Sequence, residues 1–426
     1  MRITHLSTYD LSGGAARAAY RLHTGLRSLG HDSRLLVYEK ESTDPSVIHF
    51  EPAFDVGTRL RRGLKRRIIE RSQGALISRP AGASYFSDDR TQHGGDVLRQ
   101  ALPSDILHLH WIAHFIGYSD FFRRLPPRVP LVWTLHDMNP FTGGCHHAAD
   151  CRNFFETCGC CPQLNSPSPD DFSNAAWRRK RRSYDRLNPN RFCVVTPSRW
   201  LADEAGRSAL MSKFRINVIP YGLDTQRFQP RDRAKARELL GVPQHATVLL
   251  FVAQWLEDKY KGMPTLLQAI DRLKATPDLY LLILGRGQSL AGCPLPNISL
   301  GPISDEESLS FAYSAADLFL LPTLQDNFPN TALEALACGL PVVGSRVGGV
   351  PEIVRDGCTG VLFERANAEA LANAVEKLLQ DPDRRRQMSA NCRRVAEQEY
   401  ALEVQARCYL ALYESILSEQ THRAEP

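Results

Sequence analysis

The sequence predicts an α/β protein with two parallel β-sheets covered by helices. Short runs rich in Val, Ile and Leu alternate with stretches of helical period, and strands of this composition are typical of parallel sheets buried on both faces. The chain has 426 residues, which is enough for two or three domains. A turn-rich segment at 220–230 separates two arrays of such runs, so we expect a hinge there.

The first array predicts an N-terminal domain over residues 1–219. Its expected strands lie at 2–6, 33–38, 106–110, 131–135, 192–196 and 216–219. The second array predicts a C-terminal domain over residues 220–400. Its expected strands lie at 248–253, 280–284, 318–321 and 341–344. Ser304 and Glu307 have capping-box spacing, so a helix should follow Ser304.

The end of the chain predicts terminal helices. Residues 382–420 contain no glycine and are rich in good helix formers, with apolar positions at helical spacing. We expect the last helix, 401–426, to pack back across the N-terminal domain.

Composition excludes several other classes of protein. Hydrophobic residues make up 43% and charged residues 23%, which is typical of soluble globular proteins and excludes disorder or coiled coil as the dominant state. A net charge of +5 does not indicate a nucleic-acid partner. The N-terminus lacks the apolar stretch of a secretory signal, and no apolar run approaches the ~20 residues of a membrane-spanning helix. Eleven cysteines without such a signal predict a reducing, cytoplasmic location.

A glycine pair follows the first predicted strand. Open parallel sheets bind ligands beyond the carboxyl ends of their strands, and Gly13 and Gly14 lie at such an end. Small residues there let a ligand approach the backbone, and a helix N-terminus favours an anion. An ordinary turn has the same composition, so the pair alone does not establish a site.

Histidines lie on and after the neighbouring predicted strands. His136 follows the apolar strand 131–135, from where an imidazole can hydrogen-bond a substrate hydroxyl, although a core or capping histidine is the alternative. His108 and His110 share one face of the preceding strand. We expect one of them to be buried and hydrogen-bonded.

The most informative stretch is 322–341, which reads PTLQDNFPNTALEALACGLP. Asp326 follows a predicted strand, Asn330 or Thr331 can cap the next helix, and Glu334 lies in the first turns of that helix. The stretch resembles the C-terminal signature of glycosyltransferase family 4, the retaining nucleotide-sugar enzymes of the GT-B fold. In that signature two acidic residues are separated by seven others, as Asp326 and Glu334 are, although the family's usual first member is Glu.

The resemblance covers most of the chain, including 348–352 and 356–360, and implies a fold and a site. The fold is GT-B, with two Rossmann-like domains whose parallel sheets face a central cleft. The implied catalytic residues are His136, Asp326 and Lys261. The implied donor-binding residues are Gly13, Gly14, Gln254, Lys261, Gly285, Asp326, Asn327, Phe328, Pro329, Asn330, Thr331 and Glu334. Asp326 would contact hydroxyls of the donor sugar, and Glu334 those of the ribose.

The segment after strand 248–253 resembles the family's phosphate-binding loop, in which an Arg is followed by Lys-Gly. Gln254 takes the approximate Arg position, so Lys261 is the main candidate for neutralising the diphosphate. Lys259 or Arg286 could replace the missing guanidinium. Gly285 matches the strand end that borders the nucleotide.

Five cysteines lie between Cys145 and Cys161, in an expected insertion at about 143–165. Soft ligands with CxxC spacing suit tetrahedral zinc. We therefore predict a structural zinc held by Cys145, Cys151, Cys158 and Cys161, with free thiols in a loop as the alternative. The resemblance implies that the chemistry itself requires no cofactor.

Two basic clusters suit the anionic surface of a membrane. In residues 59–69 Arg and Lys are interleaved with Leu and Ile in a helical pattern, and residues 177–182 read WRRKRR. A solvated helix face is the alternative. The prediction is peripheral contact with the inner face of the plasma membrane.

The predicted function is that of a retaining glycosyltransferase with a UDP- or GDP-sugar donor and a glycan or lipid-linked glycan acceptor. The motif around the cysteines resembles bacterial exopolysaccharide and O-antigen transferases, which favours a role in exopolysaccharide or lipopolysaccharide biosynthesis. One alternative is a nucleotide-sugar epimerase of the same architecture, which forms product without an acceptor. Another is an inactive donor-binding scaffold, because Asp326 and Gln254 depart from the family pattern.

Overall fold

The computed structural model describes residues 1–53, 55–74, 85–287 and 292–424. The chain forms two compact units. The first runs from Met1 to Pro220 and includes the C-terminal segment from Gln405 onward, and the second is Tyr221–Val404.

The first unit contains a seven-stranded parallel sheet of order β3-β2-β1-β4-β5-β6-β7. Its strands are β1 (Arg2–Tyr9), β2 (Asp32–Glu39), β3 (Val47–His49), β4 (Ile106–Leu109), β5 (Leu131–Thr134), β6 (Phe192–Thr196) and β7 (Arg215–Val218). Its helices are α1 (Gly14–Ser28), α2 (Val56–Ser72), α4 (Leu98–Ala101), α5 (Tyr118–Arg124), α6 (Phe172–Tyr184), α7 (Arg199–Arg207) and most of α15 (Leu402–Ala424). Three 3-10 turns lie between β5 and α6: Asn139–Phe141, Asn153–Phe155 and Pro162–Leu164.

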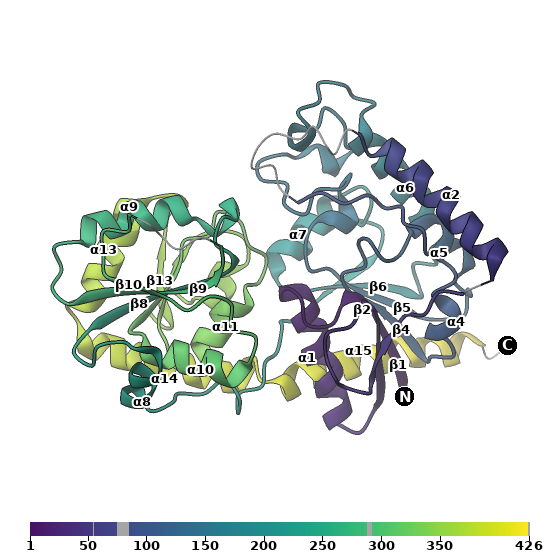
Figure 1. Cartoon of the computed structure of the whole chain (residues 1–426). Coiled ribbons are helices and arrows are strands. Elements are labelled where there is room, and N and C mark those ends of the chain that lie inside the picture. Colours follow the sequence, from purple (N-terminus) through teal and green to yellow (C-terminus); the bar gives the residue numbers. More distant parts are fainter. Residues whose placement is uncertain (54, 75–84, 288–291, 425–426) are drawn as a thin grey trace. The chain divides into compact units, whose positions relative to one another are not determined.

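Helices cover both faces of this sheet (Figure 1). On one face, α1 and α15 pack on a core that includes Ile3, Val132 and Tyr409. On the other face, α5, α6 and α7 close a larger core around Trp133. Because both faces are buried, the strands read as continuous apolar runs, and this is why they could be predicted.

The second unit contains a six-stranded parallel sheet of order β10-β9-β8-β11-β12-β13. Its strands are β8 (Thr247–Trp255), β9 (Leu279–Arg286), β10 (Asn297–Ser299), β11 (Leu318–Leu321), β12 (Val342–Ser345) and β13 (Gly360–Phe363). Its helices are α8 (Arg233–Leu240), α9 (Met263–Leu273), α10 (Glu306–Ala315), α11 (Asn330–Ala337), α12 (Val350–Ile353), α13 (Ala368–Leu379) and α14 (Pro382–Glu399), with a 3-10 turn at Lys259–Lys261. Helices again lie on both faces of the sheet, α9 and α13 on one of them (Figure 1).

Both sheets share the strand order of a Rossmann fold. The fold class is therefore confirmed as two Rossmann-like α/β units. One local prediction was off by a residue. Helix α10 is capped by Asp305, whose carboxylate accepts the amide of Ser308, and not by Ser304.

Candidate donor and catalytic sites

A Lys–Asp ion pair lies in the second unit, at the carboxyl ends of two neighbouring strands. Lys261 ends the 3-10 turn after β8, and Asp326 lies in the loop after β11. The Lys261 Nζ donates to Asp326 Oδ2 over 2.7 Å, and both side chains are partly buried. Burial lowers the pKa of Lys261, but the charge and hydrogen bond of Asp326 outweigh burial, so the pKa is raised. The ammonium therefore stays charged at neutral pH.

Backbone contacts bring these two loops together. Tyr260 O accepts hydrogen bonds from Thr323 Oγ1 and from the amide of Leu324, both at 2.7 Å. Gly262 has a φ of 76°, and a Cβ built there would lie 1.8 Å from Pro322 O. The loop after β11 can therefore approach Lys261 this closely only because residue 262 is glycine.

A second glycine holds the other side of Asp326. A Cβ on Gly348, which has a φ of 53°, would lie 1.9 Å from Asp326 O, and the amide of Gly349 donates to that oxygen. Gly348 and Gly349 both belong to the segment 348–352 after β12, which resembles the corresponding segment of the family. Their role here is to clamp the backbone that carries Asp326.

Helix α11 follows the Asp326 loop. It begins at Asn330 after Pro329, and no side chain caps it, so neither Asn330 nor Thr331 has the predicted capping role. The backbone amides of its first turn thus lack a side-chain cap and suit an anion. Glu334 is buried within the helix, where its carboxylate accepts from Tyr313 Oη at 2.9 Å.

The remaining signature residues are buried beside this helix. Asn327 and Phe328 are 8% and 4% exposed. Phe328 packs edge-on against Tyr221 and Tyr400, at centroid distances of 5.7 and 6.0 Å. Phe328 therefore anchors the loop and has its ring in the core.

The other predicted donor residues border the ends of β8 and β9. Gln254 is exposed near the end of β8. Gly285 has a φ of 152°, and a Cβ there would lie 2.1 Å from Ala253 O, so it permits close strand packing. The two candidate replacements for the missing Arg stack on aromatic rings, Lys259 on Tyr260 and Arg286 on Trp255.

In the first unit, Gly13 caps α1 with a φ of 92° and is followed by Gly14, the first residue of the helix.

Sequence analysis missed Asp10, which shapes the carboxyl end of this sheet. Asp10 is fully buried, and its carboxylate accepts the amides of Leu11, Glu41 and Ser42 at 2.9 Å. It ties the end of β1 to the end of β2.

His136 follows β5 as predicted and is joined to two buried histidines. His110 Nδ1 lies 3.1 Å from His136 Nε2, and His110 Nε2 lies 2.9 Å from His5 Nδ1. Burial lowers the pKa of His136 to about 4 and the pKa values of the other two well below the usual value. All three rings are therefore neutral at pH 7, and each contact must have one N–H donor and one lone pair.

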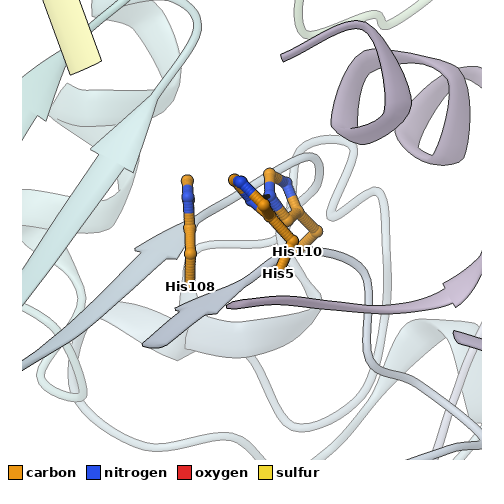
Figure 2. Close-up of side chains that lie close together, drawn as sticks. All are labelled: His5, His108 and His110. Atoms are coloured by element: carbon orange, nitrogen blue, oxygen red, sulfur yellow. Dashed lines mark hydrogen bonds between the residues drawn. The ribbon is translucent and has the colours of Figure 1, made fainter. Parts of the chain in front are cut away.

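The third buried histidine beside this string is His108 (Figure 2). In the part of the chain that the structure describes, ligand atoms of His5, His108 and His110 lie within 4.8 Å of one another. His108 is hydrogen-bonded at both nitrogens, to Tyr413 Oη at 2.7 Å and Thr134 Oγ1 at 2.8 Å. The ring centroids of His108 and His110 are 4.2 Å apart, and the ring planes are tilted by 33°. The three histidines therefore fit a hydrogen-bonded core. The expectation that His108 or His110 is buried and hydrogen-bonded is confirmed.

Asp137 forms a second network that sequence analysis missed. Its Oδ2 accepts from Trp111 Nε1 at 2.8 Å and lies 2.6 Å from His146 Nδ1, while His146 Nε2 contacts Ser87 Oγ at 2.6 Å. Burial raises the pKa of Asp137, but the charge and hydrogen bond of His146 hold it at about 2. The ionised carboxylate thus pins the cysteine-rich insertion next to His136.

The four predicted zinc ligands line one small apolar cavity, together with Phe86 and Phe154. Cys145, Cys158 and Cys161 are buried, whereas Cys160 is exposed. The amide of Gly143 donates to Cys158 Sγ at 3.1 Å. Among the described residues, however, only the three histidines above bring three ligand atoms within 4.8 Å, so zinc binding would require these sulfurs to move closer together.

The two basic clusters differ in their surroundings. Helix α2 carries the first, and its apolar residues Val56, Leu60, Leu64 and Ile68 are 56–82% exposed. In the second cluster, on α6, Arg178, Arg181 and Arg182 are exposed, whereas its other members are not. Trp177 and Lys180 are buried, and Arg179 pairs with Asp88 and Asp89 at 2.9 and 2.6 Å.

Comparison with known proteins identifies the class. Residues 12–227 match the family model described as Glycosyltransferase Family 4, and residues 246–381 match the model described as Glycosyl transferases group 1. The first match covers half of the chain, so this protein belongs to glycosyltransferase family 4, as the resemblance implied. Its two Rossmann-like units have the GT-B architecture.

Individual relatives agree with this class. The D-inositol 3-phosphate glycosyltransferase of Mycobacterium sp. (strain KMS) is 36% identical over 179 residues, which is 39% of each chain. The enzyme of the same name from Geodermatophilus obscurus is 32% identical over 311 residues, or 68% of this chain and 62% of that protein. The first of these matches thus spans about two fifths of its relative's length.

Solved structures share the fold at low sequence identity. Sucrose-phosphate synthase from Thermosynechococcus elongatus has a TM-score of 0.66 and 19% identity over 98% of this chain and all of that one. Anabaena HepE in complex with UDP-glucose has a TM-score of 0.63 and 17% identity over 97% of this chain and all of that one. Among the described residues, no helix is long and apolar enough to cross a membrane.

Proposed function

We propose that this glycosyltransferase moves a sugar, with retention, from a UDP- or GDP-sugar to a hydroxyl of a glycan or lipid-linked glycan in surface polysaccharide biosynthesis. The observation that carries the donor assignment is the Lys261–Asp326 pair beside the uncapped start of α11. A fixed cation and a helix N-terminus without a side-chain cap are the groups that a departing diphosphate needs. The complexes of Anabaena HepE with UDP and UDP-glucose support this donor class.

Each residue has a defined part in the proposed mechanism. Lys261 and the amides of α11 stabilise the negative charge that grows on the leaving diphosphate. Asp326 orients Lys261 and accepts from a donor-sugar hydroxyl, while buried Glu334 faces the ribose. His136 is neutral at pH 7, so it hydrogen-bonds the donor sugar without adding charge. The donor phosphate takes the acceptor's proton on the same sugar face, and the chemistry uses no metal ion.

Calorimetric titration with a panel of nucleotide sugars tests this proposal. Wild type should bind one nucleotide class selectively, and Lys261→Ala and Glu334→Ala should weaken that binding. Lys274→Ala is the matched control, because Lys274 is exposed at the end of α9 and pairs with Asp271. Absence of saturable binding by wild type would contradict the donor site. An epimerase would convert the donor without acceptor, and a scaffold would bind it without turnover.

We further propose that the first unit contacts the inner face of the plasma membrane through α2. Its four exposed apolar residues are spaced by four, so they form one stripe along the helix, and Arg and Lys flank them. Leu60→Ser/Leu64→Ser should reduce sedimentation with vesicles containing phosphatidylglycerol. The control is Leu239→Ser, since Leu239 is similarly exposed on α8. Equal sedimentation of all variants would contradict this surface.

The cysteine cavity leads us to propose one structural zinc ion. Cys145, Cys151, Cys158 and Cys161 all line this one small apolar cavity, and four thiolates are a ligand set that tetrahedral zinc prefers. Elemental analysis should give one zinc per chain for wild type and for Cys160→Ser, whose thiol is exposed. Cys158→Ser should lose the metal. Wild-type protein without zinc after expression in zinc-supplemented medium would refute the site.

A further inference from the structure

A cavity of about 600 Å³ lies in the first unit beside α2, within the size range of small-molecule sites. Its floor comes from the carboxyl ends of two neighbouring strands, with Tyr38 and Glu39 from β2 and His49 from the edge strand β3. Phe50 and His93 add aromatic rings in edge-to-face contact, with centroids 5.1 Å apart. No role in the donor site accounts for this cavity.

Three arginines of α2 line the opposite wall. Arg59, Arg62 and Arg66 are spaced by three and four residues, so they share one face of the helix and all border the cavity. Arg62 Nη1 is buried and has no hydrogen-bond partner among the residues that the structure describes. Among the described residues, the ion pair of Arg66 is an exposed contact of 3.5 Å with Glu70. Such a contact is weak, so this guanidinium is available to a ligand.

The lining carries three guanidinium groups against one carboxylate, Glu39. Guanidinium groups bind phosphate oxygens bidentately, and a buried N–H without an acceptor makes that interaction more favourable. Tyr38 and Phe50 offer apolar ring surface next to this charge. The cavity therefore has the chemistry of a site for a phosphate ester that carries a further, less polar group.

The cavity and His136 both lie at the carboxyl ends of the strands of the first unit's sheet. From β2 to β5 there are three strand spacings in the order β2-β1-β4-β5, or ~14 Å. An acceptor whose anion is held at α2 would extend along this edge and present a hydroxyl near His136. We propose that the cavity is the acceptor subsite, and that it binds the phosphate or diphosphate group of a phosphorylated acceptor. This inference rests on the proposed transfer reaction.

Two sources could supply such a group: a polyprenyl diphosphate lipid or a soluble sugar phosphate. The stripe formed by Val56, Leu60, Leu64 and Ile68 lies on the same helix as the arginines and favours the lipid. The shared chemistry is the phosphate group, and the experiment separates the sources.

Titration of the full chain with inorganic pyrophosphate, farnesyl diphosphate and glucose 1-phosphate tests the proposal. Arg59→Gln/Arg62→Gln should weaken pyrophosphate binding at least about tenfold. Arg61→Gln/Arg67→Gln is the matched control, because it removes the same charge from the same helix while neither residue lines the cavity. Equal weakening by both pairs, or no binding to wild type, would overturn the proposal.

A Lys261→Ala background separates this site from the donor site. Pyrophosphate binding that is sensitive to Arg62 should persist there even if nucleotide-sugar binding is lost, and its disappearance would contradict a separate site. Tighter binding of farnesyl diphosphate than of pyrophosphate, reduced by Leu64→Ser, would identify the lipid source. Tighter binding of glucose 1-phosphate, unaffected by Leu64→Ser, would identify the soluble source.

Discussion

The two units have the same strand order but build their ligand edges in different ways. In the second unit, backbone contacts through Gly262 and Gly348 clamp one ion pair between loops. In the first unit, side chains from distant segments meet in hydrogen-bonded networks, as in His5 with His110 and Asp137 with His146. The comparison teaches that one topology can hold the carboxyl ends of its strands in place either by close backbone contacts at glycines or by networks of polar side chains.

The largest effect is expected from the ion pair of the second unit. Lys261→Ala should lower kcat/KM for transfer or donor hydrolysis by about 10²–10³, because a fixed charge next to the leaving diphosphate is lost. Steady-state kinetics with the donor found by titration would measure this. Lys274→Ala should match wild type. A Lys261→Ala enzyme with unchanged kinetics would show that the diphosphate is neutralised elsewhere.

The backbone clamp can be broken with a matched pair of glycine substitutions. Gly262→Ala should reduce the free energy of unfolding by ~2–5 kcal/mol, since a positive φ and overpacking against Pro322 O both oppose a Cβ. Gly241 has a similar φ of 67°, but a Cβ added there would meet nothing within 4 Å. Gly241→Ala should therefore cost only ~1–2 kcal/mol. Urea denaturation of both variants would compare them, and equal losses would show that the close approach at Gly262 is unimportant.

The histidine networks predict a pH dependence in the first unit. Burial lowers the pKa values of His136 and His23 to about 4, so between pH 6.5 and 4 the unfolded chain binds protons that the folded chain does not. The contribution of these two histidines to stability should therefore be constant above about pH 6.5 and fall as the pH drops toward 4, by about 3 kcal/mol for each group.

Denaturant unfolding at pH 7 and pH 4.5 would measure this loss. His23→Gln should reduce the pH-dependent part. His245→Gln should leave it unchanged, because His245 is exposed. The same pH dependence of stability in wild type and His23→Gln would contradict a neutral, buried His23.

The smallest effect concerns the carboxylate of α11. Tyr313→Phe removes the hydroxyl that holds Glu334 and should weaken donor binding by severalfold, about 1 kcal/mol for a single hydrogen bond. The rest of the helix should be unaffected. Titration with the donor would measure the change, and loss as large as in Glu334→Ala would show that Tyr313 itself contacts the ligand.

Much of the fold could be predicted from the sequence because buried parallel strands are continuous apolar runs. The edge strands β3 and β10 were missed, since a three-residue strand has too few positions for a pattern to be recognised. The edge strand β13 was missed as well. The cap of α10 was displaced by one residue because both Ser304 and Asp305 can cap, and only the backbone geometry decides between them.

The site residues of the second unit could be predicted from the sequence, whereas the networks of the first unit could not. Asp326 and Glu334 could be predicted because their spacing is local, within one loop and helix. The His5–His110–His136 string and the partner of Asp137 could not, because register across three strands and the fold of the insertion bring them together. Asp10 carries no sequence signal that separates it from an ordinary turn aspartate.

The central claim is that the Lys261–Asp326 site binds a nucleotide sugar and transfers its sugar with retention. The most direct measurement is proton NMR of slow donor hydrolysis by wild type and Lys261→Ala, which reports both the rate and the anomer first released. The account predicts release of the same anomer as in the donor, at a rate reduced by about 10²–10³ in the variant. Release of the opposite anomer, or equal rates for the two proteins, would contradict it.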